Sequence, residues 1–314
     1  MLTGITEVEL EQELAQEFDH IKDKKYTFFD QGFGEDERRR KIKHTFPRLL
    51  ESFDRQTRQF LEDKIFDHFD EQEKQQQTCR IMDQGCGKAF SIRVATFDYE
   101  FMSRHTICFE GYAVGGALKQ MTALGRARRN TPPAEEKKTV PQIYHFPKPA
   151  NRHGVEQNVR FYGIADDLHR VMKEFPYELD LVFSDMTYMH LLAPWLAFKR
   201  TVERLAVGGV ALVRTLTNNI YSIPERVVID VSGEMINDSF LLNQLRKSNH
   251  SNYDLFTSSD EVPVTTAVIR KGDEPFRTDM YLGTIKDDSG RESIQCVYTE
   301  DEQQATGLLA IDRL

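Results

Sequence analysis

The sequence has no long apolar run. Its longest candidates, Leu191–Phe198 and Val207–Val213, fall far short of the roughly 20 apolar residues that a membrane-spanning helix needs. The opening residues Met1–Glu7 also lack a basic region followed by an apolar one, which is the pattern of a secretory signal peptide. We therefore expect a soluble protein without a membrane partner.

Cysteine is scarce as well. The four cysteines show no CxxC spacing; they are Cys79, Cys86, Cys108 and Cys296. The nine histidines are scattered, so no Cys–His cluster has the spacing of zinc ligands. This pattern excludes a disulfide framework and predicts buried, reduced thiols in a cytoplasmic protein without a structural metal.

An excess of positive charge is missing too. The chain has 41 basic against 50 acidic residues and a formal net charge of -9, which opposes non-specific binding to nucleic acid. One segment departs from this mean, because residues 119–152 hold eight Lys or Arg residues and only two acids. This basic segment could bind RNA or a phosphorylated substrate, or it could be a solvated loop, and both alternatives stay open.

What the sequence does contain is an alternation of apolar strands and amphipathic helices, which begins at Thr78. Strands are predicted at about 78–82, 106–110, 158–163, 179–184 and 208–215. Helices are predicted between them at about 88–102, 115–129, 166–174 and 191–205. A further helix at about 234–247 precedes two strand-like stretches, Val264–Ile269 and Asp279–Ile285. This order predicts an α/β fold with a mostly parallel sheet and helices on both faces.

The first 77 residues have a different character. Thr6 and Glu9 form a capping-box pair, and apolar residues then recur at helical spacing. We predict that residues 1–77 form a helical N-terminal extension or lid, and that residues 78–314 form the main domain. Within that domain, a loop insertion at about 130–157 holds most of the basic segment.

The strongest motif is Asp83-Gln84-Gly85-Cys86-Gly87, at the end of the first apolar strand. Glycines at such a turn let the backbone approach a ligand closely. The start of the helix predicted to follow favours carboxylate or phosphate groups. The motif differs from the dinucleotide fingerprint GxGxxG, because Ala89 stands where a third glycine would fall.

Acidic residues also end three later strands. Glu110, followed by Gly111, is expected to end the second strand, where an acid can accept hydrogen bonds from ribose hydroxyls. Asp166 and Asp167 follow the third strand, although Asp166 could instead cap the next helix. Asp185 ends the fourth strand. Because the carboxyl ends of parallel strands meet at one edge, these acids predict a ligand site there.

These motifs resemble the class I S-adenosylmethionine-dependent methyltransferase family over about residues 78–285. The resemblance implies a Rossmann-like, doubly wound, mostly parallel seven-stranded sheet that ends in an antiparallel hairpin, formed here by Val264–Ile269 and Asp279–Ile285. It also implies S-adenosyl-L-methionine as the cofactor. The cofactor-binding residues would be Asp83, Gly85, Cys86, Gly87, Glu110, Gly111, Asp166, Asp167 and Asp185.

Methyl transfer from a sulfonium is an in-line displacement, so most of the acceleration comes from alignment of the acceptor with the methyl carbon. A general base is needed only where the acceptor is protonated. The catalytic candidates follow the fourth strand and are Asp185, Tyr188 and His190. Tyr188 could stack on the acceptor or simply pack, and His190 could be a base or a helix-start residue.

Two classes of methyl acceptor are compatible with an enzyme of this kind. A small molecule or a protein side chain is favoured, because the chain is acidic. The alternative is RNA ribose 2′-O-methylation, in which a Lys-Asp-Lys-Glu tetrad would be filled by Lys64, Asp185, Arg214 and Glu261. Arg214 stands in place of a lysine and cannot readily supply a neutral amine, which breaks the pattern. A third hypothesis is an inactive binding or scaffolding protein on a methyltransferase fold.

Overall fold

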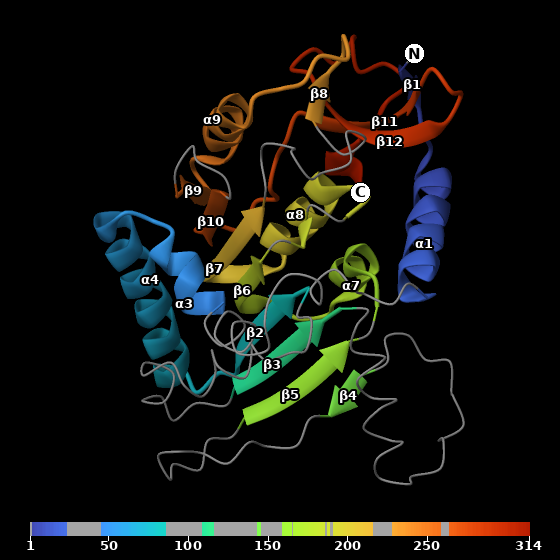
Figure 1. Cartoon of the computed structure of the whole chain (residues 1–314). Helices are drawn as coiled ribbons and strands as arrows, with labels where there is room; N and C mark the ends of the chain where they lie inside the picture. The colour runs from blue at the N-terminus through green and yellow to red at the C-terminus, as the bar shows by residue number, and fades with distance from the viewer. Residues whose placement is uncertain are drawn as a thin grey trace, which may run out of the picture.

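The computed structural model describes residues 2–23, 45–85, 109–115, 143–145, 159–164, 166–185, 187–188, 191–215, 228–258 and 264–314. These segments form two β-sheets, one of eight strands and one of five (Figure 1). The helices predicted at 88–102 and 115–129 lie outside the described residues, apart from residue 115, as does most of the basic segment.

The larger, central sheet has the strand order β4-β5-β3-β2-β6-β7-β10-β9. In chain order, its strands are β2 (Cys79–Gln84), β3 (Phe109–Val114), β4 (Ile143–His145), β5 (Val159–Ile164), β6 (Leu179–Asp185), β7 (Leu205–Thr215), β9 (Tyr253–Thr257) and β10 (Val264–Arg270). The five strands from β5 to β7 are parallel, while β4 and β10 run antiparallel to their neighbours. The predicted α/β class with a mostly parallel sheet is therefore confirmed.

Helices cover both faces of this sheet (Figure 1). On one face lie α3 (Thr45–Glu51) and α4 (Arg55–Lys74), which share a core with alternate strand residues such as Ile81 and Leu212. On the other face lie α7 (Leu168–Glu174) and α8 (Pro194–Glu203), packed on residues such as Met82 and Ala211. Successive strand side chains point to opposite faces, so these near-continuous apolar strands fill both cores at once.

The smaller, second sheet has the order β1-β11-β12-β8, with β13 paired to β11. Its strands are β1 (Leu2–Gly4), β8 (Val228–Asp230), β11 (Met280–Lys286), β12 (Glu292–Tyr298) and β13 (Leu309–Ala310). It shares a third core with α1 (Glu7–Asp23), α8 and α9 (Asp238–Asn249), and the short 3-10 helix Ile311–Arg313 closes that core through Ile311. The two ends of the chain thus meet in one sheet.

The expected C-terminal hairpin is wrong in its composition. Val264–Ile269 is strand β10 as predicted, but its hairpin partner is β9, a strand that the sequence analysis missed. The stretch Asp279–Ile285 corresponds to β11, which pairs with β12 in the second sheet across a turn at Gly290 (φ +82°). The described central sheet also has eight strands rather than seven, because β4 is added at one edge.

The N-terminal region is not purely helical, since β1 precedes α1. The capping box between Thr6 and Glu9 is confirmed, because each residue hydrogen-bonds the other's backbone amide. Since α4 shares a core with the central sheet, it is part of the α/β layers. The division of the chain at residue 77 stays a prediction.

Two of the four cysteines lie in the described segments, and both are buried and outside any disulfide, as predicted. Cys79 is in β2, and Cys296 is in β12, where burial raises the pKa of the thiol to about 12. Among the helices of the described ranges, none is both long and apolar enough to cross a membrane.

Candidate functional site at the carboxyl edge of the central sheet

The strand order places a topological switch point between β2 and β6. From β2 the chain moves outward to β3 and β5 on one side, then returns to β6 and β7 on the other. Loops that leave neighbouring strands in opposite directions open a crevice beyond their carboxyl ends, and ligands of such sheets bind there. We call this end of the parallel strands the carboxyl edge, and the opposite end the amino edge.

Gly85 forms the turn at the carboxyl end of β2. Its φ of +74° lies in the left-handed region, and its amide donates a 2.9 Å hydrogen bond to the carbonyl of Val114 at the end of β3. A Cβ atom at Gly85 would lie 1.7 Å from Oγ1 of Thr187. Conformation and close approach both demand glycine here. Asp83, two residues earlier, is 4% exposed, and Cys86 and Gly87 lie outside the described residues.

Beneath this turn lies a buried polar network that the sequence analysis missed. The Gln84 side chain, fully buried, donates from Nε2 to Thr201 Oγ1 at 2.9 Å and accepts from the Tyr188 hydroxyl at 2.8 Å. The Gln84 carbonyl accepts hydrogen bonds from Ser184 Oγ at 3.1 Å and Thr187 Oγ1 at 3.0 Å. An amide at an inward strand position, between Met82 and Gly85, was the available signal, because buried polar groups need partners.

Tyr188 belongs to this network. The residue is 4% exposed, and its hydroxyl also lies 2.8 Å from Thr201 Oγ1. Burial raises the pKa of the phenol above its usual range, against the hydrogen bonds to Thr201 and Gln84. This geometry favours the packing alternative for Tyr188 over stacking on an acceptor. His190, the third catalytic candidate, lies outside the described residues.

Asp185, at the end of β6, is bound by Arg214 at the facing position of β7. The guanidinium donates from Nε to Oδ1 at 2.7 Å and from Nη2 to Oδ2 at 2.6 Å, a bidentate geometry. Arg214 is 4% exposed, whereas the Asp185 side chain is 21% exposed. The carboxylate is therefore held in place at the carboxyl edge, and this pairing indicates a positioning role more than that of a free base.

The tetrad of the RNA alternative is not assembled in the described residues. Lys64 lies on the exposed outer side of α4, where its ammonium sits 5.7 Å from the centre of the Phe60 ring. Arg214 does meet Asp185, but as a bidentate partner of the carboxylate. Glu261 lies outside the described residues. No lysine amine therefore stands beside Asp185 in the part of the chain that the structure describes.

Asp166 and Asp167 follow β5 at the carboxyl edge, as expected. Asp167, not Asp166, is the N-cap of α7, and its carboxylate accepts from the amides of His169 and Arg170. Burial opposes the ionisation of Asp167, but the hydrogen bonds from His169 and the helix amides outweigh it and lower the pKa of the carboxyl. Asp166 is 4% exposed and pairs with the Arg170 guanidinium.

The expectation that Glu110 ends a strand is wrong. Strand β3 begins at Phe109, so Glu110 is its second residue and faces Arg80 near the start of β2. Its carboxylate accepts hydrogen bonds from Arg80 Nε at 3.1 Å and from the Tyr112 hydroxyl at 2.9 Å. At about 3.3 Å per residue, Glu110 lies roughly 13 Å short of the carboxyl end of β3. Glu110 and Gly111 are therefore not brought together with Gly85.

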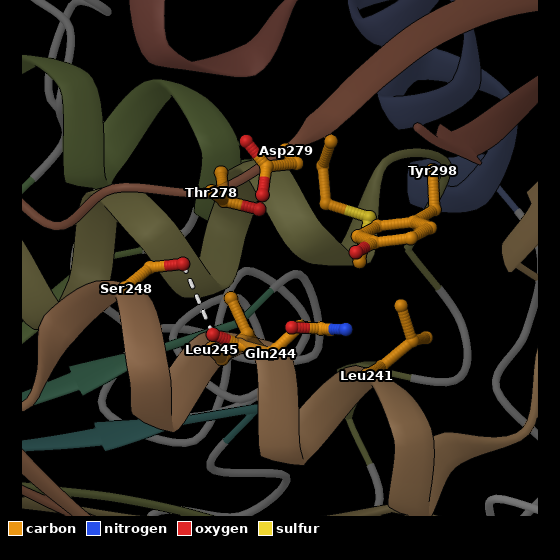
Figure 2. A pocket seen from close by; sticks show the side chains of 8 residues that line it. Leu241, Gln244, Leu245, Ser248, Thr278, Asp279 and Tyr298 are labelled. Atoms are coloured by element: carbon orange, nitrogen blue, oxygen red, sulfur yellow. Dashed lines mark hydrogen bonds between the residues drawn. The ribbon is translucent and has the colours of Figure 1, made fainter. Parts of the chain in front are cut away.

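A separate, narrow crevice lies between α9 and the adjoining ends of β11 and β12 (Figure 2). Its lining residues are Leu241, Gln244, Leu245, Ser248, Thr278, Asp279, Met280 and Tyr298. Ser248 Oγ donates to the Gln244 carbonyl at 3.0 Å, so part of its polar lining is satisfied within α9. None of the predicted cofactor-binding or catalytic residues lines this crevice, so it does not support a second cofactor site.

Comparisons with known proteins address the fold. No family model and no curated protein matches the sequence. Among solved structures, the SAH-bound Podospora anserina methyltransferase PaMTH1 is 14% identical, with a TM-score of 0.35 over 86% of this chain and 90% of that one. The plantazolicin methyltransferase BpumL in complex with SAH is 10% identical, with a TM-score of 0.38 over 83% and 100%. An rRNA methylase from Streptococcus thermophilus is 11% identical, with a TM-score of 0.33 over 62% and 88%.

Two of these three proteins are bound to SAH. At such low identities and TM-scores, the similarity assigns neither an acceptor nor a site residue. The strand order, the parallel register and the helices on both faces are properties of this chain itself. The described chain has the Rossmann-like α/β fold that its resemblance to the class I methyltransferases implies.

Proposed function

We propose that this protein is an S-adenosylmethionine-dependent methyltransferase that binds its cofactor at the carboxyl edge of the central sheet. One observation carries this proposal: the glycine turn at Gly85, with φ +74°, falls at the point where the strand order reverses. A turn that only glycine can make, placed at the switch point, lets the backbone approach a nucleoside-bearing ligand closely.

Several predicted residues fit such a ligand and two do not. Gly85 would form the floor of the site, and Cys86 and Gly87, the next two residues of the sequence, stay predicted cofactor-binding residues. Asp166 and Asp167 lie two strands away at the same edge and would face the adenosine side. Glu110 and Gly111 do not fit, because they lie toward the amino edge. When bound, the cofactor supplies an electrophilic methyl group on a sulfonium.

The protein's own part would be to bind and align the two reactants. Asp185, fixed by Arg214, offers a carboxylate of defined direction next to the switch point. Such a group can accept a hydrogen bond from an acceptor and so orient it. We propose a small molecule or a protein side chain as the acceptor, since the chain is acidic and no lysine joins Asp185 in the described segments.

Calorimetry with S-adenosylmethionine tests the cofactor site directly. We expect saturable binding to the wild-type protein and its loss in Gly85→Ala. Gly233→Ala is the matched control, because Gly233 also has a positive φ of +92° but, apart from its two chain neighbours, no described residue has an atom within 4 Å of the added methyl group. Absence of binding at millimolar cofactor would contradict the proposal.

The acceptor requires a second measurement. Radiolabelled methyl transfer into fractionated cell extract would show whether the label enters small molecules, protein or RNA. Label in RNA would contradict the proposed acceptor class and favour the ribose alternative. Tight cofactor binding without transfer into any fraction would instead favour the inactive binding protein.

A further inference from the structure

The hydrogen bonds around Gln84 close into a ring. Tyr188 has a single hydroxyl proton, and it is donated to Gln84 Oε1 at 2.8 Å. The 2.8 Å contact between Tyr188 and Thr201 must therefore be a donation from Thr201. Gln84 Nε2 in turn donates to Thr201 Oγ1 at 2.9 Å. Each of the three groups donates once and accepts once, and we call this arrangement the Gln84 ring.

The orientation of the Gln84 amide is fixed independently of the ring. Its Nε2 also lies 3.3 Å from Met172 Sδ and 3.8 Å from Met82 Sδ, and thioether sulfur can only accept. A flipped amide would place its oxygen against those two sulfur atoms, which cannot donate to it, and would leave both sulfur atoms without the amide donor. The direction of the hydrogen bonds around the ring is thus determined by its surroundings.

The three members come from three separate elements. Gln84 is the last residue of β2, Tyr188 follows β6, and Thr201 lies within α8. All three are buried, with Gln84 and Thr201 fully so. The Gln84 carbonyl adds two further bonds toward the β6 side, from Ser184 and Thr187. The ring therefore joins both walls of the switch point to a helix beneath them.

We propose that the Gln84 ring is a positioning unit, which sets the Gly85 turn against the segment after β6 and so couples the cofactor side of the site to the acceptor side. This inference rests on the proposed function for its functional meaning. Its physical basis is separate: a closed, fully satisfied polar ring in a low-dielectric core strengthens each of its bonds and specifies one arrangement. Gln84, Tyr188 and Thr201 would act through Gly85 and Thr187, without touching the reactants.

The test uses variants that remove one hydroxyl each, Tyr188→Phe and Thr201→Val, and the double variant. Breaking the ring at either place should lower the affinity for S-adenosylmethionine by roughly five- to tenfold. Because one break already opens the ring, the double variant should lose little more than either single variant, so the effects are non-additive. Cofactor affinity, or KM against kcat where turnover is measured, is the readout.

Tyr253→Phe is the matched control. Tyr253 is 1% exposed in the same core as Tyr188, and its hydroxyl donates to the Glu274 carbonyl at 3.1 Å, outside the ring. We expect Tyr253→Phe to leave cofactor affinity within twofold of the wild-type value. An equal loss in Tyr253→Phe, or additive losses in the double variant, would overturn the proposal, because either result is what general core damage produces.

Hydrogen exchange separates this inference from the proposed function. In Tyr188→Phe, the amides of Gly85 and Thr187 should exchange faster together, while Tyr253→Phe leaves both unchanged. This readout needs no cofactor. If the wild-type protein fails to bind S-adenosylmethionine, the proposed function is lost but coupled exchange still supports the ring. Unchanged exchange at both amides would refute the ring whatever the cofactor result.

Discussion

The two ends of the central sheet are both rich in charged residues, yet they are built differently. At the amino edge, Arg80 pairs with Glu110, and the Asp180 carboxylate accepts from the Arg80 amide at 2.6 Å and lies 2.7 Å from His68 Nε2. These contacts tie strand starts to one another. At the carboxyl edge, a positive-φ turn at Gly85 ends strand β2 at the point where the strand order reverses.

The comparison teaches that acidic residues alone do not mark a site. Glu110 and Asp185 are both acidic strand residues paired with an arginine, and the sequence predicted that both bind the same ligand. Their difference lies in the backbone that surrounds them. Glu110 sits where five parallel strands begin, whereas Asp185 sits beside the glycine turn and the switch point.

The largest effect is expected for Gly85→Ala at the carboxyl edge. The new methyl group would meet Thr187 Oγ1, whose hydrogen bond to the Gln84 carbonyl resists displacement. Positive φ, overpacking and a lost hydrogen bond together should cost about 4 kcal/mol of unfolding free energy. Gly233→Ala bears only the first of these and should cost about 1 kcal/mol. Chemical denaturation measures both, and equal losses would contradict the close approach at Gly85.

Removal of the paired acid should distinguish the two edges next. Asp185→Ala leaves Arg214 buried at 4% exposure without its carboxylate, which should cost about 3 kcal/mol. Glu110→Ala leaves Arg80, whose side chain is 28% exposed and stays hydrated, so the loss should be about 1 kcal/mol. Denaturant titration provides the values.

Cofactor affinity should also distinguish Glu110 at the amino edge from Asp185 at the carboxyl edge. Because Glu110 lies at the amino edge, Glu110→Gln should change the affinity for S-adenosylmethionine by less than twofold. A large loss there would restore Glu110 to the site and contradict the assignment of the edges.

Two buried threonines test whether connectivity or mere polarity matters near the carboxyl edge. Thr201 is fully buried with its hydroxyl in the Gln84 ring, while Thr265, also fully buried, has a hydroxyl with no hydrogen-bond partner among the described residues. Thr201→Val should destabilise by about 1–2 kcal/mol, and Thr265→Val should stabilise by about 1 kcal/mol. Thermal denaturation of both variants measures the two changes in stability. If both variants were destabilised or both stabilised, the explanation by hydrogen-bond connectivity would be wrong.

The smallest effect concerns pH. Hydrogen bonds lower the pKa of Asp167 in the folded state against the opposing effect of burial. Its contribution to stability is therefore present above the unfolded pKa of about 3.9 and is lost as the pH falls through the lower folded value. Asp167→Asn should be less stable than wild type at pH 7, and the difference should shrink toward pH 3. A constant difference across that range would exclude linkage to this carboxyl.

The alternation of apolar segments predicted most of the central sheet, because strands buried on both faces carry an unmistakable local pattern. The helices α7, α8 and α9 were predicted because their apolar residues also recur in a local pattern, at helical spacing. The Glu110 error arose because Gly111 resembles a turn residue, whereas in the structure it continues β3 between Glu110 and Tyr112. The ion pair with Arg80 and the Tyr112 hydroxyl stabilises a charged residue within that strand.

Contacts between distant segments left no such local pattern. The pairing of β10 with β9 and of β11 with β12 depends on which strand lies nearby in space, so the hairpin was assigned to the wrong pair. The Gln84 ring joins Gln84 to two residues that lie more than a hundred positions later in the chain, and only the amide at the end of β2 indicated it. The Gly85 turn was predicted because it depends on the absence of a side chain at a single residue, and the sequence shows that directly.

Strand β1 has a consequence for how the chain is made. Thr3 Oγ1 donates to the Thr284 carbonyl at 3.2 Å, across 281 positions. At 5–20 residues per second, synthesis reaches Thr284 roughly 15–55 s after Thr3 is incorporated. During this interval, the opening segment has no edge to pair with and stays accessible to proteases. Nascent chains halted before β11 should therefore be cleaved within the β1 segment, while chains that include β11 are protected there.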